Sequence, residues 1–389
     1  MPSIELNLTF LTITAVASSR RSPPHSAMPF SLNNTPGLKP KACPICSSET
    51  GLIRCVSCEV LDYCGSRHEI SHKQHHYPTC ILIKYTRIAL DNEERKIRTQ
   101  FEDDDVNPLD TSAEYFPSLR NAHPYLATRL RLVNLLLDHF GAAGGYTHVV
   151  RGALDHTLDM IRLDPSDKLY ISNIIPALYI RLGMDQEAYN FLDWWFATSN
   201  GPFSQWTSMD LPFLDPDYRR KDILAPLEDS WDAVGSFSLN QWVAVLLIKM
   251  KVLLDLRAMQ NARRAFHGVI PTELVDIIRM KLSVNSAASQ NRVAQADFEE
   301  TASMIATIKK EVWELYHAIT DYNPHIWSMM SEVKIMSMTN RHFDNIRASF
   351  QPGSHLEGCI ALRYNFPAWA ETPGAVQAIE YLNMAQSTS

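Results

Sequence analysis

The chain has 389 residues, of which 46% are hydrophobic and 20% are charged, as in a globular protein with a sizeable core. Its formal net charge of −7 excludes a general attraction to nucleic acid or to an anionic membrane surface. Seven cysteines in a chain of this length exclude a disulfide-dense scaffold, and the length favours two or three domains.

We expect residues 1–40 to form a disordered N-terminal extension, because they are rich in Ser, Pro and Asn and show no apolar periodicity. Within them, Leu6–Ala17 is apolar enough to suggest the core of a secretory signal. The flanking charges are reversed for that role, because Glu5 precedes the segment and two arginines follow it. We therefore expect a cytoplasmic or nuclear protein, with Met28 as an alternative natural start.

Residues 41–80 carry six of the seven cysteines, at the spacing of metal ligands. Two Cys-x-x-Cys pairs come first, and two pairs of one cysteine and one histidine follow, each at a spacing of four residues. The eight residues are Cys43, Cys46, Cys55, Cys58, Cys64, His68, His76 and Cys80. Because Zn²⁺ takes four such ligands in a structural site, the set predicts two tetrahedral zinc sites.

The spacing allows two divisions of these ligands. A Cys-x-x-Cys pair on a tight turn fills two corners of a tetrahedron, and a pair four residues apart lies on one face of a helix. The sequential division joins both Cys-x-x-Cys pairs in one site, whereas the interleaved division gives one pair to each site. Interleaving is favoured because two independent halves would be too small to bury a core. His75 is an alternative to His76 that the four-residue spacing to Cys80 disfavours.

This order of ligands, with the dipeptide Tyr63-Cys64, resembles the MYND-type zinc finger over about forty residues. The resemblance implies two zinc ions bound in the interleaved way: one by Cys43, Cys46, Cys64 and His68, the other by Cys55, Cys58, His76 and Cys80. His68 stands where cysteine is commoner in the family. Glu69 and Lys73 replace the usual Gln and Trp on the face that receives Pro- and Leu-containing peptides in some members.

Four protein ligands for each ion leave no position for water or substrate, so both sites are predicted to be structural. A redox role for either Cys-x-x-Cys pair is not favoured, because no βαβ pattern accompanies it. Residues 39–89 carry seven basic and four acidic side chains, and each zinc site with three thiolates adds one negative charge, so the net charge is only +1. No recognition-helix pattern of the Cys₂His₂ kind is present. We expect no direct binding of nucleic acid.

A helix is predicted after the finger, and residues 81–105 are interpreted as a linker helix that ends in an acidic run at 102–105. Residues 106–389 are predicted to be an α-helical domain. Its first helices are expected at 125–140, 146–163, 169–182 (bent or begun afresh at Pro176) and from Asp185 to Trp195. The segment 181–189 is similar to the turn of a tetratricopeptide hairpin.

Residues 199–235 are expected to be an ordered irregular connection in which Trp206 and Trp231 are buried. Further helices are predicted at 238–260, 271–282 and 295–320. The tail, residues 323–389, is predicted to contain short helical pieces. The apolar stretch Leu239–Leu256 contains three charged residues, so it predicts a buried helix rather than a membrane span. The predicted fold class is all-α, with a small cross-braced two-zinc finger and a large tetratricopeptide-like helical domain.

An enzyme is not predicted. A SET-type lysine methyltransferase is disfavoured, because only about forty residues precede the finger, no Asn-His-Ser-Cys motif occurs and Cys359 stands alone. The glycine-rich turn at 141–145 lacks the Lys-Ser/Thr of a phosphate-binding loop. We expect a protein that interacts with other proteins, including short peptide segments, and not with membranes. The alternative is an enzyme of unrecognised type in the helical region.

Overall fold

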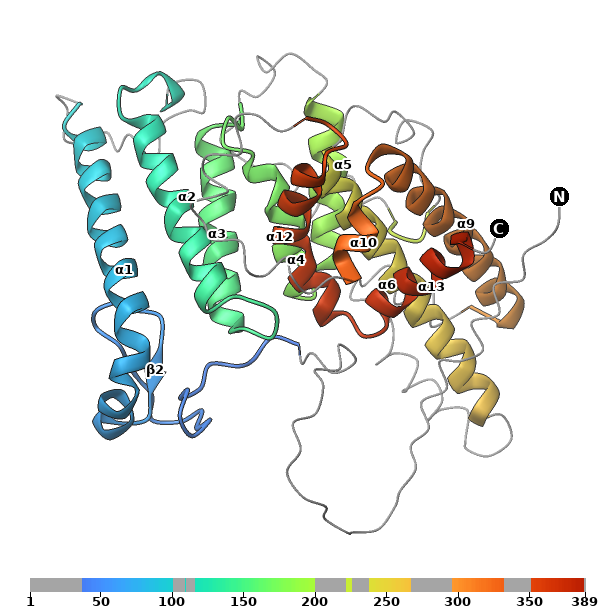
Figure 1. Cartoon of the computed structure of the whole chain (residues 1–389), viewed down its shortest axis with the longest axis horizontal. Coiled ribbons are helices and arrows are strands. Elements are labelled where there is room, and N and C mark those ends of the chain that lie inside the picture. Colours follow the sequence, from blue (N-terminus) through green and yellow to red (C-terminus); the bar gives the residue numbers. More distant parts are fainter. Residues whose placement is uncertain are drawn as a thin grey trace, which may run out of the picture. The chain divides into compact units, whose positions relative to one another are not determined.

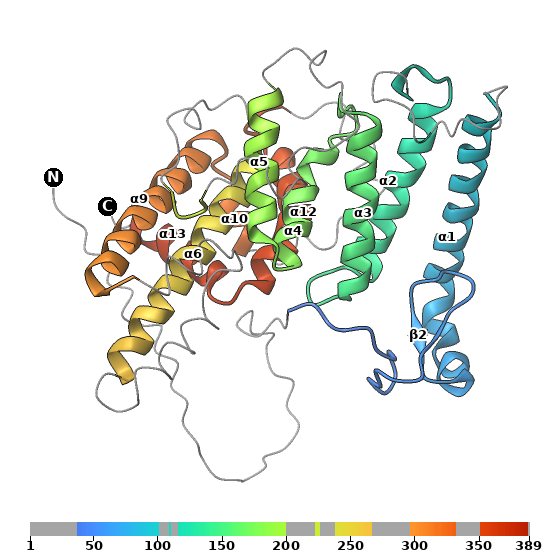
Figure 2. The same ribbon diagram turned by 180° about the vertical axis from the view of Figure 1, so that it is seen from behind.

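The computed structural model describes residues 37–100, 109, 116–199, 222–225, 238–266, 296–331 and 351–387 (Figures 1 and 2). Four predictions concern residues outside this part of the chain: the extension up to residue 36, the acidic run at 102–105, the helix at 271–282, and the burial of Trp206 and Trp231. The described residues all belong to one compact unit.

Residues 41–80, predicted to be a zinc finger and called the finger below, contain a minimal sheet and the start of a long helix. Strand β1 (Ile53–Arg54) pairs antiparallel with β2 (Asp62–Tyr63), with Ile53 opposite Tyr63. These are the only two strands among the described residues, and a single isolated bridge joins Lys39 to Tyr146. Val60, Leu61 and Tyr63, which lie in β2 or just before it, have buried side chains.

Helix α1 (Ser66–Arg98) is longer than the sequence predicts, because it begins inside the finger rather than near Cys80. Pro78 lies within it and is exposed to solvent. The predicted start rests on the apolar pattern that begins after Cys80. Proline in a helix interior removes one backbone hydrogen bond and usually ends or kinks the helix. Packing decides otherwise, since Cys80 and Ile83 just beyond it are buried.

The next helices follow the predicted order. They are α2 (Ala122–His139), α3 (Thr147–Leu163), the 3₁₀ turns η3 (Phe116–Ser118) and η4 (Ile171–Asn173), α4 (Ile175–Arg181) and α5 (Asp185–Ser199). Helix α4 begins afresh at the predicted place, with Pro176 in its first turn. Gly183, with a φ of 71°, turns the chain into α5, so a helical hairpin lies where the tetratricopeptide-like turn is predicted. A repeating array of such hairpins remains a prediction.

Helix α6 (Leu239–Phe266) lies at the centre of the remaining helices and contacts α4, α5, α9, α12 and α13, while α10 packs on α12 and α13. Those not yet given are α9 (Phe298–Tyr322), α10 (Ile326–Ser331), α12 (His355–Glu371) and α13 (Ala375–Ser387). The run Val243–Ile248 of α6 is fully buried, as predicted for a core helix. Among the described residues, no helix combines the length and the apolar character that a bilayer crossing requires. The all-α class is confirmed.

Buried cations brace this helical body. Lys249 of α6 has no exposed surface and lies 3.0 Å from a carboxylate oxygen of Glu311 on α9. Its ammonium group also donates to the carbonyl oxygens of Ile223 (3.0 Å) and Ala225 (2.9 Å). A buried charge needs such partners, because an unpaired one costs several kcal/mol. Lys249 therefore holds segment 222–225 against the core.

The finger is docked on the loop between α2 and α3. The Lys39 amide donates to Gly145 O (2.7 Å), and Thr147 N returns a bond to Lys39 O (2.9 Å). On the next turn, His148 Nε2 donates to Val60 O at 3.0 Å, and this contact joins α3 to the core of the finger. Hydrogen bonds therefore fix both the finger, at Val60, and the segment just before it, at Lys39, to the helical body, which α1 also joins to the finger.

The contact between His148 and Val60 gives a testable prediction. His148→Leu leaves the Val60 carbonyl without its donor, so we expect the free energy of unfolding to fall by about 1–2 kcal/mol. His148→Gln, whose amide supplies an N–H at a similar position, is the matched control and should lose less than half of that. Urea denaturation followed by circular dichroism measures both. Equal losses in the two variants would contradict the assignment.

Candidate metal centre

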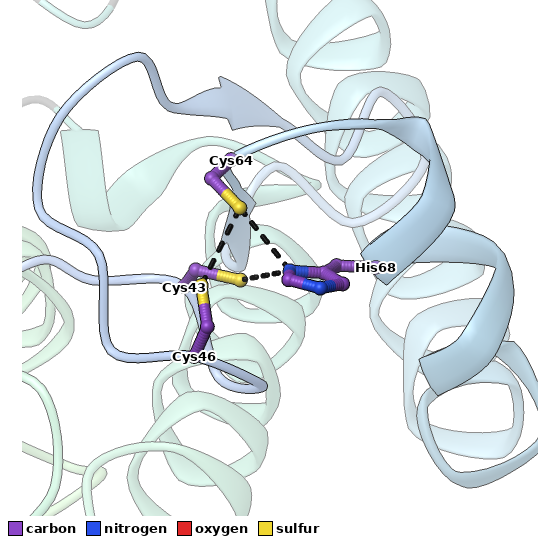
Figure 3. A group of neighbouring side chains, drawn as sticks. All are labelled: Cys43, Cys46, Cys64 and His68. Carbon is purple, nitrogen blue, oxygen red and sulfur yellow. Dashed lines mark hydrogen bonds between the residues drawn. The ribbon is translucent and has the colours of Figure 1, made fainter.

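The first group of predicted ligands lies where the first loop meets the start of α1 (Figure 3). Cys43 and Cys46 come from one tight turn, Cys64 follows β2 directly, and His68 lies in the first turn of α1. The Sγ atoms of Cys46 and Cys64 are 3.4 Å apart. His68 Nδ1 lies 3.1 Å from the Cys64 sulfur and 3.6 Å from the Cys43 sulfur.

The second group is formed by Cys55, Cys58, His76 and Cys80, and all four residues are buried. The sulfurs of Cys55 and Cys80 are 3.7 Å apart, and His76 Nε2 is 3.4 Å from the Cys58 sulfur. His76 and Cys80 share one face of α1, while the two other cysteines come from the turn before β2. The group thus joins the second turn to the middle of the helix.

The two Cys-x-x-Cys turns have the same backbone geometry. Ser47 N donates to Cys43 O (2.8 Å) in the first turn, and Glu59 N donates to Cys55 O (2.9 Å) in the second. Ser47 and Glu59 each have a φ of 58°, the left-handed conformation that closes such a turn. In each turn the two thiols therefore face the same point.

Both groups fit a tetrahedral zinc ion. With Zn–S bonds of about 2.3 Å and Zn–N bonds of about 2.0–2.1 Å, the tetrahedron has edges of about 3.8 Å between sulfurs and about 3.6 Å between sulfur and nitrogen. The ligand atoms within each group all lie within 4.8 Å of one another, and the closest pairs span 3.1–3.7 Å. All seven cysteines are free, so disulfides do not explain the approach of the sulfurs. Two thiolate-rich sets of four suit Zn²⁺.

The structure brings the ligands together in the interleaved grouping, not in the sequential one. Cys64 differs from the expected arrangement: it precedes α1 instead of sharing a helical turn with His68. The extended residues of β2 deliver it, because that strand runs straight into the helix N-terminus. His75 is exposed and belongs to neither group.

Backbone and burial act on the thiols in opposite ways. Burial raises the pKa of the Cys43 thiol, but the backbone N–H groups of Cys64, Ile45 and Cys46 lower it more, to about 6. Burial, together with the neighbouring thiols of Cys58 and Cys55, raises the pKa of Cys80 to about 12. A bound divalent cation favours the thiolate form at every such ligand, so zinc binding releases protons.

Three supporting residues were missed by sequence reasoning. Asp62 is buried and lies 3.0 Å from the Lys41 ammonium, which ties the first loop to β2. Arg87 Nε donates to Cys58 O (3.0 Å), and His148 holds Val60 as described above. Nothing in the local pattern identifies these residues, because their partners are remote. His72, which the sequence suggests is a solvated helix residue or a group that supports the ligands, lies with its Nδ1 3.0 Å from the Tyr63 hydroxyl.

Comparisons of the chain with protein-family models, with curated proteins and with solved structures find no match. The description of the metal centre therefore depends on its geometry and on the chemistry of its donors. Within the described part of the chain, no other group of three or more Cys, His, Asp or Glu side chains is arranged to hold a metal ion.

Proposed function

We propose that residues 41–80 are a MYND-type zinc finger with two structural Zn²⁺ ions. The protein as a whole is then a non-enzymatic protein that binds other proteins, with the finger as a recognition module on a helical scaffold. The observation that carries the proposal is the pair of interleaved Cys/His groups, each of which brings four ligand atoms within 4.8 Å of one another, as a tetrahedral site requires. The dipeptide Tyr63-Cys64 agrees with the family pattern, and Tyr63 is buried.

Zinc bound in these groups supplies folding free energy and crosslinks the finger. The chain's own residues position the crosslinks: the two turns face their thiols inward, and α1 contributes a ligand to one group and two ligands to the other. With four protein ligands on each ion, no position remains for a substrate. The finger thus supports recognition rather than chemistry.

The partners we propose are other proteins, including short peptide segments, in the cytoplasm or nucleus, where thiolates stay reduced. Glu69 and Lys73, the two departures from the MYND pattern, are both exposed on α1. A charged pair at these positions favours a partner with polar side chains over the apolar peptides that some family members receive. Neither nucleic acid nor a membrane is a proposed partner.

The zinc count tests the metal assignment. We expect about two zinc ions per purified chain by mass spectrometry of the metal, and a lower count for His76→Ala, which removes a buried ligand. His75→Ala is the matched control, because this exposed neighbour lies outside both groups. Equal zinc in the two variants, or no zinc in the unaltered chain, would contradict the proposal.

Capture of partner proteins tests the recognition role. The zinc-loaded chain, immobilised, should retain proteins from a cytosolic or nuclear extract that the Cys55→Ser chain does not retain, while His75→Ala behaves like the unaltered chain. Proteins retained equally by all three chains would contradict a role of the finger and would indicate that the helical body binds them. The alternative function, an enzyme of unrecognised type, also concerns the helical body.

A further inference from the structure

A thiol, an imidazole and a thioether meet where α10 packs on α12, far along the chain from the finger (Figure 1). Cys359 Sγ lies 3.6 Å from His355 Nδ1 and 3.8 Å from Met329 Sδ. Cys359 and His355 come from the first two turns of α12, and Met329 comes from α10. We call these three residues the α10–α12 cluster. All three are side chains that bind soft metal ions.

The α10–α12 cluster uses the same helical spacing as the finger. His355 and Cys359 are four residues apart, as His76 and Cys80 are, so both side chains lie on one face of α12. Met329 adds a third donor from the helix that packs against α12. The finger's groups contain only cysteine and histidine, whereas this cluster contains a thioether. It is therefore a site of a different chemical kind.

The distances within the cluster fit one metal ion with three ligands in a plane. With bonds of about 2.3 Å to sulfur and about 2.0 Å to nitrogen, as for zinc, such an ion sets two sulfurs about 4.0 Å apart and a sulfur and a nitrogen about 3.7 Å apart. The corresponding distances from Cys359 Sγ are 3.8 Å and 3.6 Å. His325 lies nearby, with its ring 5.8 Å from that of His355, but it is not one of the three donors.

A glycine makes the approach of the thioether possible. A Cβ atom at position 358 would overlap the methyl group of Met329, so any residue other than Gly358 displaces that side chain. Glycine inside a helix costs about 0.5–1 kcal/mol relative to alanine, and here it supplies the space that the methionine occupies. Gly358 is therefore a positioning residue of the cluster.

Hydrogen bonds fix the two helices that supply the donors. Ser354 caps α12, because its hydroxyl group accepts from Glu357 N at 3.2 Å. The side-chain amide of Asn323, which is fully buried, donates to Ser354 O at 2.9 Å. The same side chain accepts from His325 N at 3.1 Å, just before α10. One amide thus joins the start of α10 to the start of α12 and holds the donors on the two helices together.

Burial favours an ion with a single positive charge. Cys359 and Met329 are only 3% and 5% exposed. One thiolate and one monovalent cation sum to zero charge, whereas a divalent cation would leave a net positive charge in a place with little water. The carboxylate of Glu357 is engaged elsewhere, because it accepts from the Tyr322 hydroxyl (3.0 Å) and from Gly353 N (2.7 Å). Among first-row metal ions, Cu(I) is the monovalent ion that thiolate and thioether ligands select.

We propose that Cys359, His355 and Met329 form a binding site for one Cu(I) ion. On binding, the Cys359 thiol releases its proton to solvent and the thiolate bonds to the ion, while the imidazole and the thioether each donate a lone pair. No electron is transferred, and the net charge of the site stays at zero. His355 is exposed, so the ion enters past its ring. The site goes beyond the proposed function and does not depend on it, because α10 and α12 supply no ligand to the finger.

Nuclear magnetic resonance of methionine methyl groups tests the site directly. The full-length, zinc-loaded chain, isotopically labelled in these methyl groups, is titrated with Cu(I) in the absence of oxygen. None of the 14 methionines lies within residues 41–80, so the finger contributes no methyl signal of its own. We expect one equivalent of Cu(I) to shift the Met329 signal, which Met329→Leu identifies, and to leave the signal of Met384 on α13 in place. Cys359→Ser should abolish the shift.

Competition with a chromogenic Cu(I) chelator then measures the affinity of each variant. Gly358→Ala keeps all three donors but displaces the Met329 side chain, so we expect binding to weaken about tenfold. His355→Ala, which removes a donor, should weaken it further. His123→Ala, a change at an exposed histidine of α2, is the matched control and should bind like the unaltered chain. Unchanged zinc content and circular dichroism show that each variant is folded.

Three results would overturn the proposal. The first is a Met329 signal that Cu(I) leaves in place, including the case in which the ion only displaces zinc from the finger. The second is a shift that persists in Cys359→Ser. The third is an equal shift on addition of excess Zn²⁺, which would contradict the choice of a soft monovalent ion. A purified chain without zinc would contradict the finger but not this site, so the two proposals fail separately.

Discussion

A chelator that removes zinc at neutral pH should unfold residues 41–80 and the first turns of α1, while the helical body remains folded. The finger has little else to stabilise it, because its hydrophobic core consists of a few side chains around Tyr63. Structural zinc contributes about 10–16 kcal/mol in small zinc-finger peptides, more than a core of this size supplies. The C-terminal half of α1 should persist, because Leu90 and Ile97 remain buried on the side of the helix that packs against α2.

Hydrogen exchange with mass spectrometry measures this outcome segment by segment. Loss of protection should cover Cys43–Cys80 and should reverse when zinc is returned. Cys55→Ser should lose protection without any chelator, whereas Cys359→Ser, a change at the buried cysteine of α12, should leave the finger protected. A chelated chain that keeps its protection between β1 and α1 would show that the finger folds without metal.

Arg181→Leu should lower the free energy of unfolding of the helical body by about 3–5 kcal/mol, the usual cost of removing one partner of a buried ion pair. The Arg181 guanidinium is almost fully buried and lies 2.7 Å from the Glu371 carboxylate. It also donates to the carbonyl oxygens of Gly141 and Ala142, and Glu371 accepts from Gly144 N at 2.8 Å. The variant leaves that carboxylate buried without its cation.

Urea denaturation measures the loss, and the exposed pair Lys310–Glu314 supplies the control. Lys310→Ala should cost less than about 0.5 kcal/mol, because exposed pairs on one helix contribute little. The double variant Arg181→Leu with Glu371→Leu should be less destabilised than the sum of the two single changes, because it leaves no unpaired charge. A cost for Arg181→Leu equal to that of Lys310→Ala would contradict the role of the pair.

The ion pair between Arg181 and Glu371 also affects how the finger is held on the helical body. Arg181 and Glu371 hold the loop between α2 and α3, and the same loop accepts the finger through the bond from Lys39 to Gly145. Loosening the loop should therefore raise the exchange rate of the Lys39 amide before the zinc ligands are lost. Stability of the body and placement of the finger are thus connected through one short segment.

Local patterns carry much of the site and much of the fold. The spacing of the eight ligands, with the size argument against two separate halves, indicates the grouping that the structure has, and apolar periodicity predicts α2, α3, α6 and α9 within a few residues. These features are accessible because a tight turn and a helical face each involve residues close together in sequence. The same short-range reasoning placed the start of α1 too late, since it relied on the apolar pattern that begins after Cys80.

Contacts between remote segments were not accessible in this way. Arg181 and Glu371 are 190 residues apart, and His148 is 88 residues from its acceptor Val60. In the sequence each is an ordinary polar residue of a helical segment, because a polar group shows its partner only once both are buried. Periodicity and ligand spacing therefore specified the helices and the donors of the metal centre, while the docking of the finger and the buried ion pairs arose only when distant helices packed together.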